Sequence, residues 1–347
     1  MRKQNLEHYI KEESSRPNLE EIKKSKHPIS KLIDVYIDLK YGISRRNYLK
    51  KESRTVKHEK RNVGAARSWF KGTCSFPLKY LKCFLDELQI PLEEVIAVKG
   101  KDPFKADIEE FKKSKHSISK LIDFYIDLNY GSSRDNYLRK ESKTLKQEKL
   151  NAKSVAGNWF TGTRPFPLKY LKGFADELQI PLEEVIAVKG KDPFKADIEE
   201  FKKSKHSISK LIDFYIDLNY GISRESYLRK ESEIVKQEKL NADTAFSWFM
   251  GDNHFPLKYL KGFADELQIP LEEVIAVNKG KNPFKPDLEN FKKSKSPIGD
   301  LINLYINMKY GINRASYLRK ESEIVKREKL NVGTADSWFT GYNPFPL

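Results

Sequence analysis

One stretch decides the fold of this chain: Phe255-Pro-Leu-Lys-Tyr-Leu-Lys-Gly-Phe-Ala-Asp-Glu-Leu-Gln-Ile-Pro-Leu-Glu-Glu-Val-Ile-Ala-Val277. The same residues stand unchanged at Phe166–Val188, and the opening Phe-Pro-Leu also recurs at Phe76 and Phe345. The four occurrences are 90, 89 and 90 residues apart. Self-similarity at a fixed period is the signature of a repeat protein. The chain is therefore one unit written almost four times.

The period sets the expected domain boundaries. We expect an N-terminal tail at residues 1–17, copy 1 at 18–99, copy 2 at 100–189, copy 3 at 190–279 and copy 4 at 280–347, with each later copy opening on a linker. Copy 4 stops at Leu347, where its fourth helix should begin. Either the sequence is a fragment or the last unit borrows packing from a neighbour, and we favour a truncated chain.

Composition narrows the class of protein. With 39% hydrophobic residues the chain can build cores, so wholesale disorder is not expected. It has no apolar run near 18 residues, and Met1 to Pro17 lacks a signal-peptide core, so we expect neither a membrane partner nor export. Two cysteines fit a reducing cytoplasm, with nucleoid association if the source is bacterial. The net charge of +16 favours an anionic partner or simply confers solubility.

Periodicity predicts an all-α fold with five short helices per copy. In the first helix, Ile118, Leu121, Ile122 and Tyr125 share one face, and Gly131 stands at its C′ position. In copy 3 the second helix starts at the N-cap Ser223, the third spans Asp243 to Met250, and the fourth spans Phe255–Gln268 with Pro256 at N1. A short fifth helix opens at Pro270, and a weakly helical, basic lead-in precedes each copy.

Two segments of copy 3 resemble the lambda-repressor/Cro class of helix-turn-helix domains. Gly221-Ile-Ser-Arg-Glu-Ser-Tyr-Leu-Arg-Lys230 is similar to the opening of the family's second helix. Phe249 through Val274 is similar to the family's segment from the end of the recognition helix through helix five. The resemblance covers about 60 of every 90 residues and implies a tandem array of four five-helix units, the last incomplete.

The resemblance implies binding of double-stranded DNA, with the third helix presenting its N-terminal residues to base edges. Four arginines take the place of a family glutamine that touches the phosphate backbone: Arg45, Arg134, Arg224 and Arg314. The implied base-reading positions on the third helix and the loop after it are Gly64, Arg67, Ser68, Lys153, Ser154, Asn158, Arg164, Asp243, Thr244, Ser247, Asn253, Thr334, Ser337 and Asn343. Aspartates at Asp243 and Asp336 depart from this picture, since a carboxylate near phosphates is usually repelled.

The chain departs from the family between helices two and three. Seven extra residues intervene, or eight in copy 2, where the family has a tight turn. Seven residues are two helical turns, so we expect helix two to be longer by roughly 10 Å. Two whole turns would keep the apolar side chains of helix two on the same side of the helix.

Charge and variation concentrate around this region. The second elements and their following turns, residues 44–61, 133–150, 223–240 and 313–330, carry +13 of the +16. The copies differ most along the third helix and in the three residues after Gly72, Gly162, Gly251 and Gly341. Either the copies read different DNA subsites, or the variation is neutral drift on an exposed surface.

Other functions have weaker support. The Trp of each Trp-Phe pair is expected in the core rather than stacked on bases, and the six histidines show no ligand spacing. Cys74 and Cys83 have no histidine pattern, so we expect no metal or other cofactor, and no small-molecule substrate is evident. We expect no enzyme, because phosphate loops and nucleophile elbows are missing from the sequence. Two hypotheses remain: a DNA-binding transcriptional regulator or DNA-organising factor using linked helix-turn-helix units, and a helical scaffold that binds partner proteins without sequence-specific DNA reading.

Overall fold

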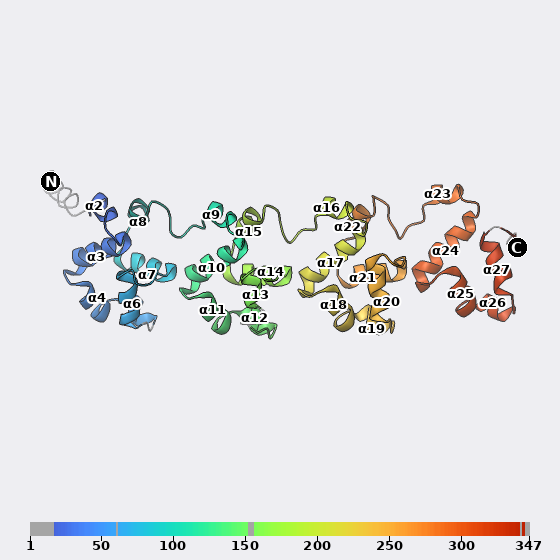
Figure 1. Ribbon diagram of the computed structural model, residues 1–347, viewed down its shortest axis with the longest axis horizontal. Helices are drawn as coiled ribbons and strands as arrows, with labels where there is room; N and C mark the ends of the chain where they lie inside the picture. Colours follow the sequence, from blue (N-terminus) through green and yellow to red (C-terminus); the bar gives the residue numbers. More distant parts are fainter. Residues whose placement is uncertain (1–16, 60–61, 152–155, 341, 344–347) are drawn as a thin grey trace, which may run out of the picture. The chain divides into compact units, whose positions relative to one another are not determined.

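The structure is a computed structural model that describes residues 17–59, 62–151, 156–340 and 342–343. Within these ranges every regular element is a helix and no strand occurs (Figure 1). The predicted all-α class is therefore confirmed. None of the helices in the described ranges combines the length and the apolar character needed to cross a membrane.

Each of the first three copies contains seven helices in the described residues. Copy 1 has α2 (Leu19–Lys23), α3 (Pro28–Tyr41), α4 (Arg45–Lys51), α5 (Arg54–His58), α6 (Val63–Phe70), α7 (Leu78–Leu88) and α8 (Leu92–Lys99). Copy 2 has α9 (Ile108–Lys112), α10 (Ser117–Tyr130), α11 (Arg134–Lys140), α12 (Lys143–Gln147), α13 (Gly157–Phe160), α14 (Leu168–Leu178) and α15 (Leu182–Lys189). Copy 3 has α16 (Ile198–Lys202), α17 (Ser207–Tyr220), α18 (Arg224–Lys230), α19 (Glu233–Gln237), α20 (Ala242–Met250), α21 (Leu257–Glu266) and α22 (Leu271–Val277). Copy 4 has α23 (Leu288–Lys292), α24 (Pro297–Tyr310), α25 (Arg314–Lys320), α26 (Glu323–Arg327) and α27 (Val332–Thr340).

Local signals in the sequence account for most helix ends. Gly221 ends α17 in the left-handed region at φ 66°, a conformation that glycine adopts without strain. Ser223 caps α18 and accepts the N–H of Ser226. Pro256 is the N-cap of α21 and not its N1 residue, so that helix begins at Leu257, two residues after the predicted start at Phe255.

Helix two is not one long helix, and the predicted extension by two turns is wrong. In copy 3, α18 ends at Lys230 and a separate short helix, α19, starts after Ser232. The Ser232 side chain accepts the N–H of Val235, as an N-cap does. The same break separates α4 from α5, α11 from α12, and α25 from α26. The extra residues therefore form their own helix and change the chain direction before the third helix.

The core of copy 3 shows how these helices pack. Phe249 of α20 and Phe263 of α21 are almost fully buried, with ring centroids 5.5 Å apart. Leu211 of α17 and Leu228 of α18 close the same cluster. Burying aromatic and leucine side chains supplies most of the stabilisation in a unit of this size.

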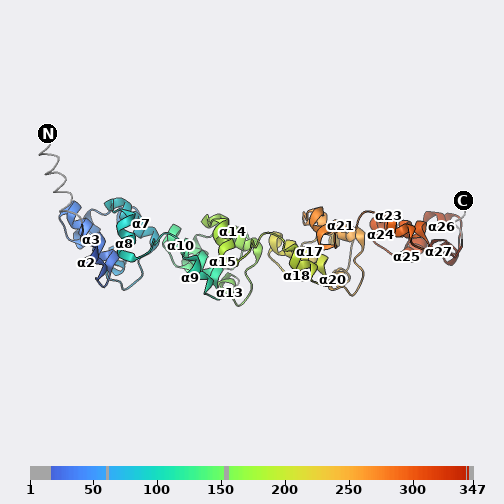
Figure 2. The same cartoon turned by 90° about the horizontal axis from the view of Figure 1, so that it is seen from above.

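The lead-in helices belong to the copies that they precede. In copy 1, α2 lies against both α3 and α8 (Figures 1 and 2). The lead-ins α9 and α16 likewise pack on α15 and α22 of their own copies. The connection between α8 of copy 1 and α9 of copy 2 is therefore only residues 100–107, and within it Phe104 packs against the core of copy 1.

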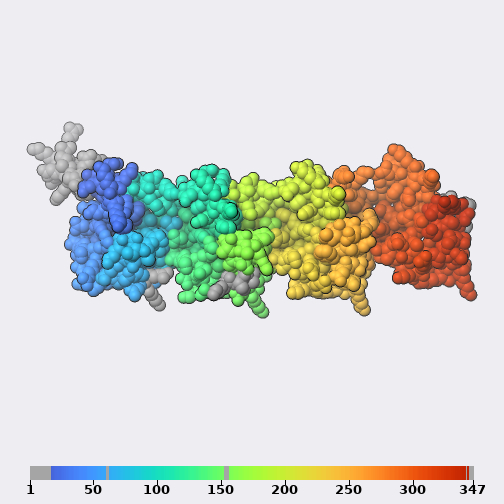
Figure 3. Space-filling view, viewed as in Figure 1, coloured from blue at the N-terminus to red at the C-terminus, as the bar shows by residue number. Residues whose placement is uncertain are grey.

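The chain divides into two compact units. The first comprises Met1–Phe166 and Gly173–Asp192, and the second comprises Pro167–Lys172 and Pro193–Leu347. In the first unit α7 of copy 1 contacts α10 of copy 2, and in the second α21 of copy 3 contacts α24 of copy 4. Figure 3 shows the surfaces of copies 1 and 2 meeting. Neighbouring copies within a unit are therefore in direct contact.

Candidate nucleic-acid interface

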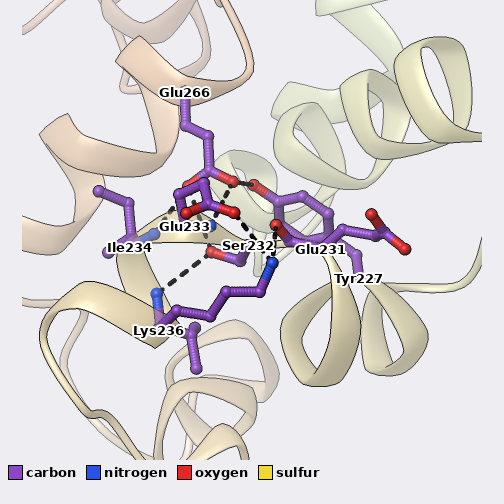
Figure 4. A network of polar contacts seen from close by, with 8 residues as sticks. Tyr227, Glu231, Ser232, Glu233, Ile234, Lys236 and Glu266 are labelled. Carbon is purple, nitrogen blue, oxygen red and sulfur yellow. Dashed lines mark hydrogen bonds and ion pairs between the residues drawn. The ribbon is translucent and has the colours of Figure 1, made fainter.

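A half-buried glutamate binds the chain at the break between the second helix and the short helix. In copy 3, Glu266 of α21 accepts the backbone N–H groups of Glu233 at 3.0 Å and Ile234 at 3.1 Å (Figure 4). It also accepts the hydroxyls of Tyr227 at 2.7 Å and Ser232 at 3.2 Å. The carboxylate thus satisfies the free N–H groups at the start of α19, where the helix dipole favours a negative charge.

Copies 1 and 2 build the same arrangement with threonine. Glu87 accepts the N–H of Thr55 at 2.9 Å and its hydroxyl at 2.7 Å, and Glu177 does the same with Thr144 at 2.9 and 2.8 Å. Burial raises the pKa of both carboxyls, but the hydrogen bonds outweigh it, so each pKa lies below its usual value. The sequence signal for these clusters is the recurring Lys-Glu-Ser together with Asp-Glu-Leu in the fourth helix.

The third helix exposes its first turn, as the resemblance implies. Gly64, Asp243, Thr244 and Thr334 are exposed there. Ser68, Ser247 and Ser337, one turn later, are half-buried. In copy 2 the predicted Lys153 and Ser154 lie outside the described residues. The first-turn candidates therefore lie on an accessible helix end in the three copies where that turn is described.

The loop residues lie beside this helix. Asn253 donates to the Ser247 hydroxyl at 2.9 Å, and Asn343 donates to the Ser337 hydroxyl at 2.7 Å. The backbone N–H of the exposed Arg164 donates to the Asn158 carbonyl at 3.2 Å. The structure thus brings each loop candidate next to a third-helix candidate of its own copy.

The four arginines assigned to phosphates are instead held inside their copies. Arg224 binds Asp213 through two nitrogens, one of them at 2.7 Å, and its guanidinium lies 4.9 Å from the Phe249 ring centroid. Arg45 and Arg134 repeat this with Asp34 and Asp123. A guanidinium paired in this way has less charge to offer a phosphate.

Copy 4 changes the partner. Asn303 stands where the other copies carry the aspartate, and Arg314 pairs with Asp336 at 2.7 Å. In copy 1 Arg67 stands at the position of Asp336, and its buried Nη2 has no hydrogen-bond partner among the described residues. Comparing the copies with one another would have revealed this pairing, because the aspartate missing at 303 reappears at 336 only in copy 4.

Asp243 is also engaged within its copy. Its carboxylate binds Arg229 at 2.8 Å, and Arg229 also binds Glu225 at 3.2 Å. These residues line a small cleft of about 250 Å³ between α18 and α20. The surface at the third helix of copy 3 is therefore of mixed charge and not basic.

Exposed positive charge is concentrated on a different surface, which we call the basic ridge. It consists of the last turn of the second helix, the short helix after it, and the following turn. Its exposed members are Lys50, Lys51, Arg54, Lys57, Arg139, Lys140, Lys143, Lys146, Lys149, Arg229, Lys230, Lys236, Lys239, Arg319, Lys320, Lys326, Arg327 and Lys329. In each copy the ridge immediately precedes the third helix. Reasoning from the sequence located the charge but placed it on one long helix.

The tryptophans of the third helix differ in burial from copy to copy. Trp159 and Trp248 are 6% and 8% exposed, while Trp69 and Trp338 are half-buried, so core packing is confirmed for the first two. In the described ranges no three His, Cys, Asp or Glu residues come together in a way that could hold a metal ion.

Similarity to known proteins adds nothing to this geometry. No protein-family model, no curated protein and no solved structure matches the chain.

Proposed function

We propose that this protein binds double-stranded DNA as a multi-copy regulator, each copy offering the first turn of its third helix beside its basic ridge. The supporting observation is the adjacency of the two surfaces: the ridge ends where the third helix begins, and its lysines and arginines are exposed. Positive charge repeated along a chain is the electrostatic footprint expected for a polyanion partner.

In this proposal phosphate contact belongs to the ridge. The four arginines are occupied by aspartates, whereas ridge residues such as Lys140 and Lys143 are exposed. Copies 1 and 2 are expected to contribute more affinity than copy 3. Their segments 44–61 and 133–150 carry +6 and +3, against +1 for 223–240.

A salt titration tests the phosphate role. Fluorescence anisotropy with a labelled random duplex is expected to show affinity falling steeply between about 50 and 200 mM salt, because bound lysines release counterions. The variant R139Q/K140Q/K143Q/K146Q is expected to bind more weakly. Its salt slope should be flatter by up to about 0.9 for each phosphate that the variant no longer neutralises.

The matched control removes four charges elsewhere in copy 2. The variant K105Q/K113Q/K115Q/K120Q alters exposed lysines of the linker, the lead-in and the first helix, and is expected to keep the parent slope. No binding by the parent chain at 50 mM salt contradicts DNA binding altogether. Equal slopes for the two variants contradict the assignment to the ridge.

Base reading is tested separately. Replacing the exposed Thr334 by alanine is expected to change the sequence selected from a random DNA library while leaving the salt slope unchanged. If the variant and the parent select the same DNA sequence, the variation among the third helices is neutral drift on an exposed surface.

A protein-binding scaffold is the second candidate, and one observation favours it. Neighbouring copies within a compact unit are joined by the same helix contact, α7 with α10 and α21 with α24. Within each compact unit the two docked copies present a shared surface, as neighbouring repeats of solenoid proteins do. If the folded chain, checked by its helix content, does not bind DNA, the protein-binding scaffold is the remaining function.

A further inference from the structure

Copies 1 and 2 meet at a junction formed by the start of a helix. The backbone N–H of Leu78, the first residue of α7, donates to the carboxylate of Asp127 in α10. Next to it, a Cβ on Gly131 would lie only 2.7 Å from the Tyr80 ring and 3.1 Å from Lys79 Cβ. A glycine is therefore needed for this close approach.

The same junction is built twice more, within the second compact unit. The N–H of Leu168 donates to Asp217, and the N–H of Leu257 donates to Asn307 at 2.6 Å. At both places a tyrosine ring comes 2.7 Å from where a glycine Cβ would stand, Tyr170 against Gly221 and Tyr259 against Gly311. Each helix start thus has the sequence Pro-Leu-Lys-Tyr and meets an Asp or Asn and a glycine four residues later.

The chemistry of the helix start explains why a neighbour is used. Pro77 and Pro256 are the N-caps of α7 and α21, and neither makes a side-chain cap. The free N–H groups of the first turn need an acceptor from elsewhere. The aspartate or asparagine of the next copy supplies it, and burial at the junction raises the pKa of Asp127.

Copy 1 has the same receiving surface, and no residue in the described part of the chain covers it. We call it the head surface and define it as Asp38, Leu39 and Gly42. All three residues are exposed, Leu39 by 52%, whereas their counterparts in copies 2 to 4 are half-buried or buried. A Cβ on Gly42 would meet no atom within 4 Å.

A groove of about 690 Å³ runs beside the head surface. Its lining includes Asp38, Gly42, Arg45 and Arg46. The equivalent groove of copy 2 is lined by Asp127, Gly131 and Arg134 together with Ser75 and Pro77 of the preceding copy. In copies 2, 3 and 4 the corresponding surface therefore binds the start of a Pro-Leu-Lys-Tyr helix from the preceding copy.

We propose that the head surface of copy 1 binds the start of a Pro-Leu-Lys-Tyr helix from another chain built of the same repeat, joining molecules head to tail. Asp38 accepts the first N–H of that helix, Leu39 is covered, and Gly42 admits the tyrosine ring. Arg46 stands where copy 2 has Asp135 and copy 3 has Glu225. The positive charge of Arg46 therefore favours a partner in which the loop before the Pro-Leu-Lys-Tyr helix carries few Lys or Arg residues.

The first experiment supplies such a helix on the full chain. The chain is extended after Leu347 by the sequence Lys258–Gly280, which continues copy 3. Sedimentation velocity from about 5 to 500 µM is expected to show a mass that rises with concentration. Adding D38R/L39E is expected to weaken association at least tenfold, while the matched exposed changes E20R/L288E leave it unchanged.

The second experiment needs no extension. In the chain of 347 residues, D127R/L128E opens the junction between copies 1 and 2 and frees the start of α7. This variant is expected to associate where the parent does not, and D38R/L39E in the same chain is expected to abolish the gain.

A monomeric extended chain whose added residues are helical by circular dichroism and resist protease overturns the proposal, as does association that ignores D38R/L39E. If the extension does not fold, the junction-opening variant decides alone. Association that requires removal of residues 1–16 identifies that segment as the occupant and also overturns the proposal.

Discussion

Copies 3 and 4 carry the same ten residues at the break, Tyr227–Lys236 and Tyr317–Lys326, in different surroundings. Both break the helix at the same place, and Ser232 and Ser322 each accept an N–H at 3.3 Å. Yet Tyr227 is fully buried and Tyr317 is not, and Ile324 is 62% exposed where Ile234 packs on Gly262. The break is therefore encoded locally, and its burial is provided by the fourth helix.

The fourth helix also contributes the glutamate. Glu266 binds four groups at the break of copy 3, and the described part of copy 4 has no residue in its place. The described core of copy 4 is correspondingly small, with Leu318, Val325, Ala335 and Phe339 buried. Copies 3 and 4 are thus a natural pair for measuring what the fourth helix adds.

The largest expected effect is in the core. Phe249→Ala is expected to cost about 3–5 kcal/mol, because the ring contacts Phe255 and Phe263 and would leave a cavity. Phe339→Ala, at the same position in copy 4, is expected to cost clearly less. Native-state hydrogen exchange, resolved by peptide, measures each copy separately, and equal losses would show that the fourth helix adds little to the core.

The second largest effect is expected from the Glu266 carboxylate. Glu266→Gln is expected to destabilise copy 3 by about 1–3 kcal/mol, because backbone N–H groups lose a charged acceptor in a partly buried place. Exchange protection of α19 should fall while that of α26 stays the same. The exposed Glu272→Gln serves as the control. Loss of protection in α26 as well would contradict a role confined to copy 3.

The serine caps test whether the break is local. Ser232→Ala and Ser322→Ala are each expected to cost about 1 kcal/mol, the usual value of an N-cap. Similar losses in the two copies, read from exchange of α19 and α26, agree with local encoding. A loss in copy 3 alone would instead make Glu266 the cause of the break.

The smallest effect is with pH. The pKa values of Glu87 and Glu177 lie below their usual value, so the stability they contribute is present above about pH 4.3 and is lost as pH falls through the folded-state pKa. Acid titration by circular dichroism should show that E87Q/E177Q flattens the loss below about pH 4.3. A profile identical to that of the parent would exclude these two carboxyls as its source.

The sequence was sufficient for the parts of the fold that depend on neighbours along the chain. Each of three predicted features depends on a single helix: the C-cap Gly221 on α17, the N-cap Ser223 on α18, and the apolar face around Leu121 on α10. The break at Ser232 was missed because seven residues are close to two helical turns. Tyr227 and Ile234 keep the same phase with or without a break, so periodicity does not reveal it.

The site was predicted only in part, for a different reason. Exposure of the first turn of the third helix follows from the unit's own pattern. The pairing of Arg224 with Asp213 joins two helices, and neither residue reveals its partner by spacing alone. Contacts between copies, such as Leu78 with Asp127, depend on packing of whole units and leave no mark in a single copy.

The tyrosine at each junction has an optical consequence. Trp69 stacks on Tyr80 at 4.9 Å, and Trp248 stacks on Tyr259 at 4.9 Å, while the same tyrosines touch glycines of the next copy. Indole emission depends on what surrounds the ring and on energy passed to it from adjacent phenols. The protein therefore carries a built-in fluorophore at each of these junctions, and its colour and polarisation report whether neighbouring copies are docked or apart.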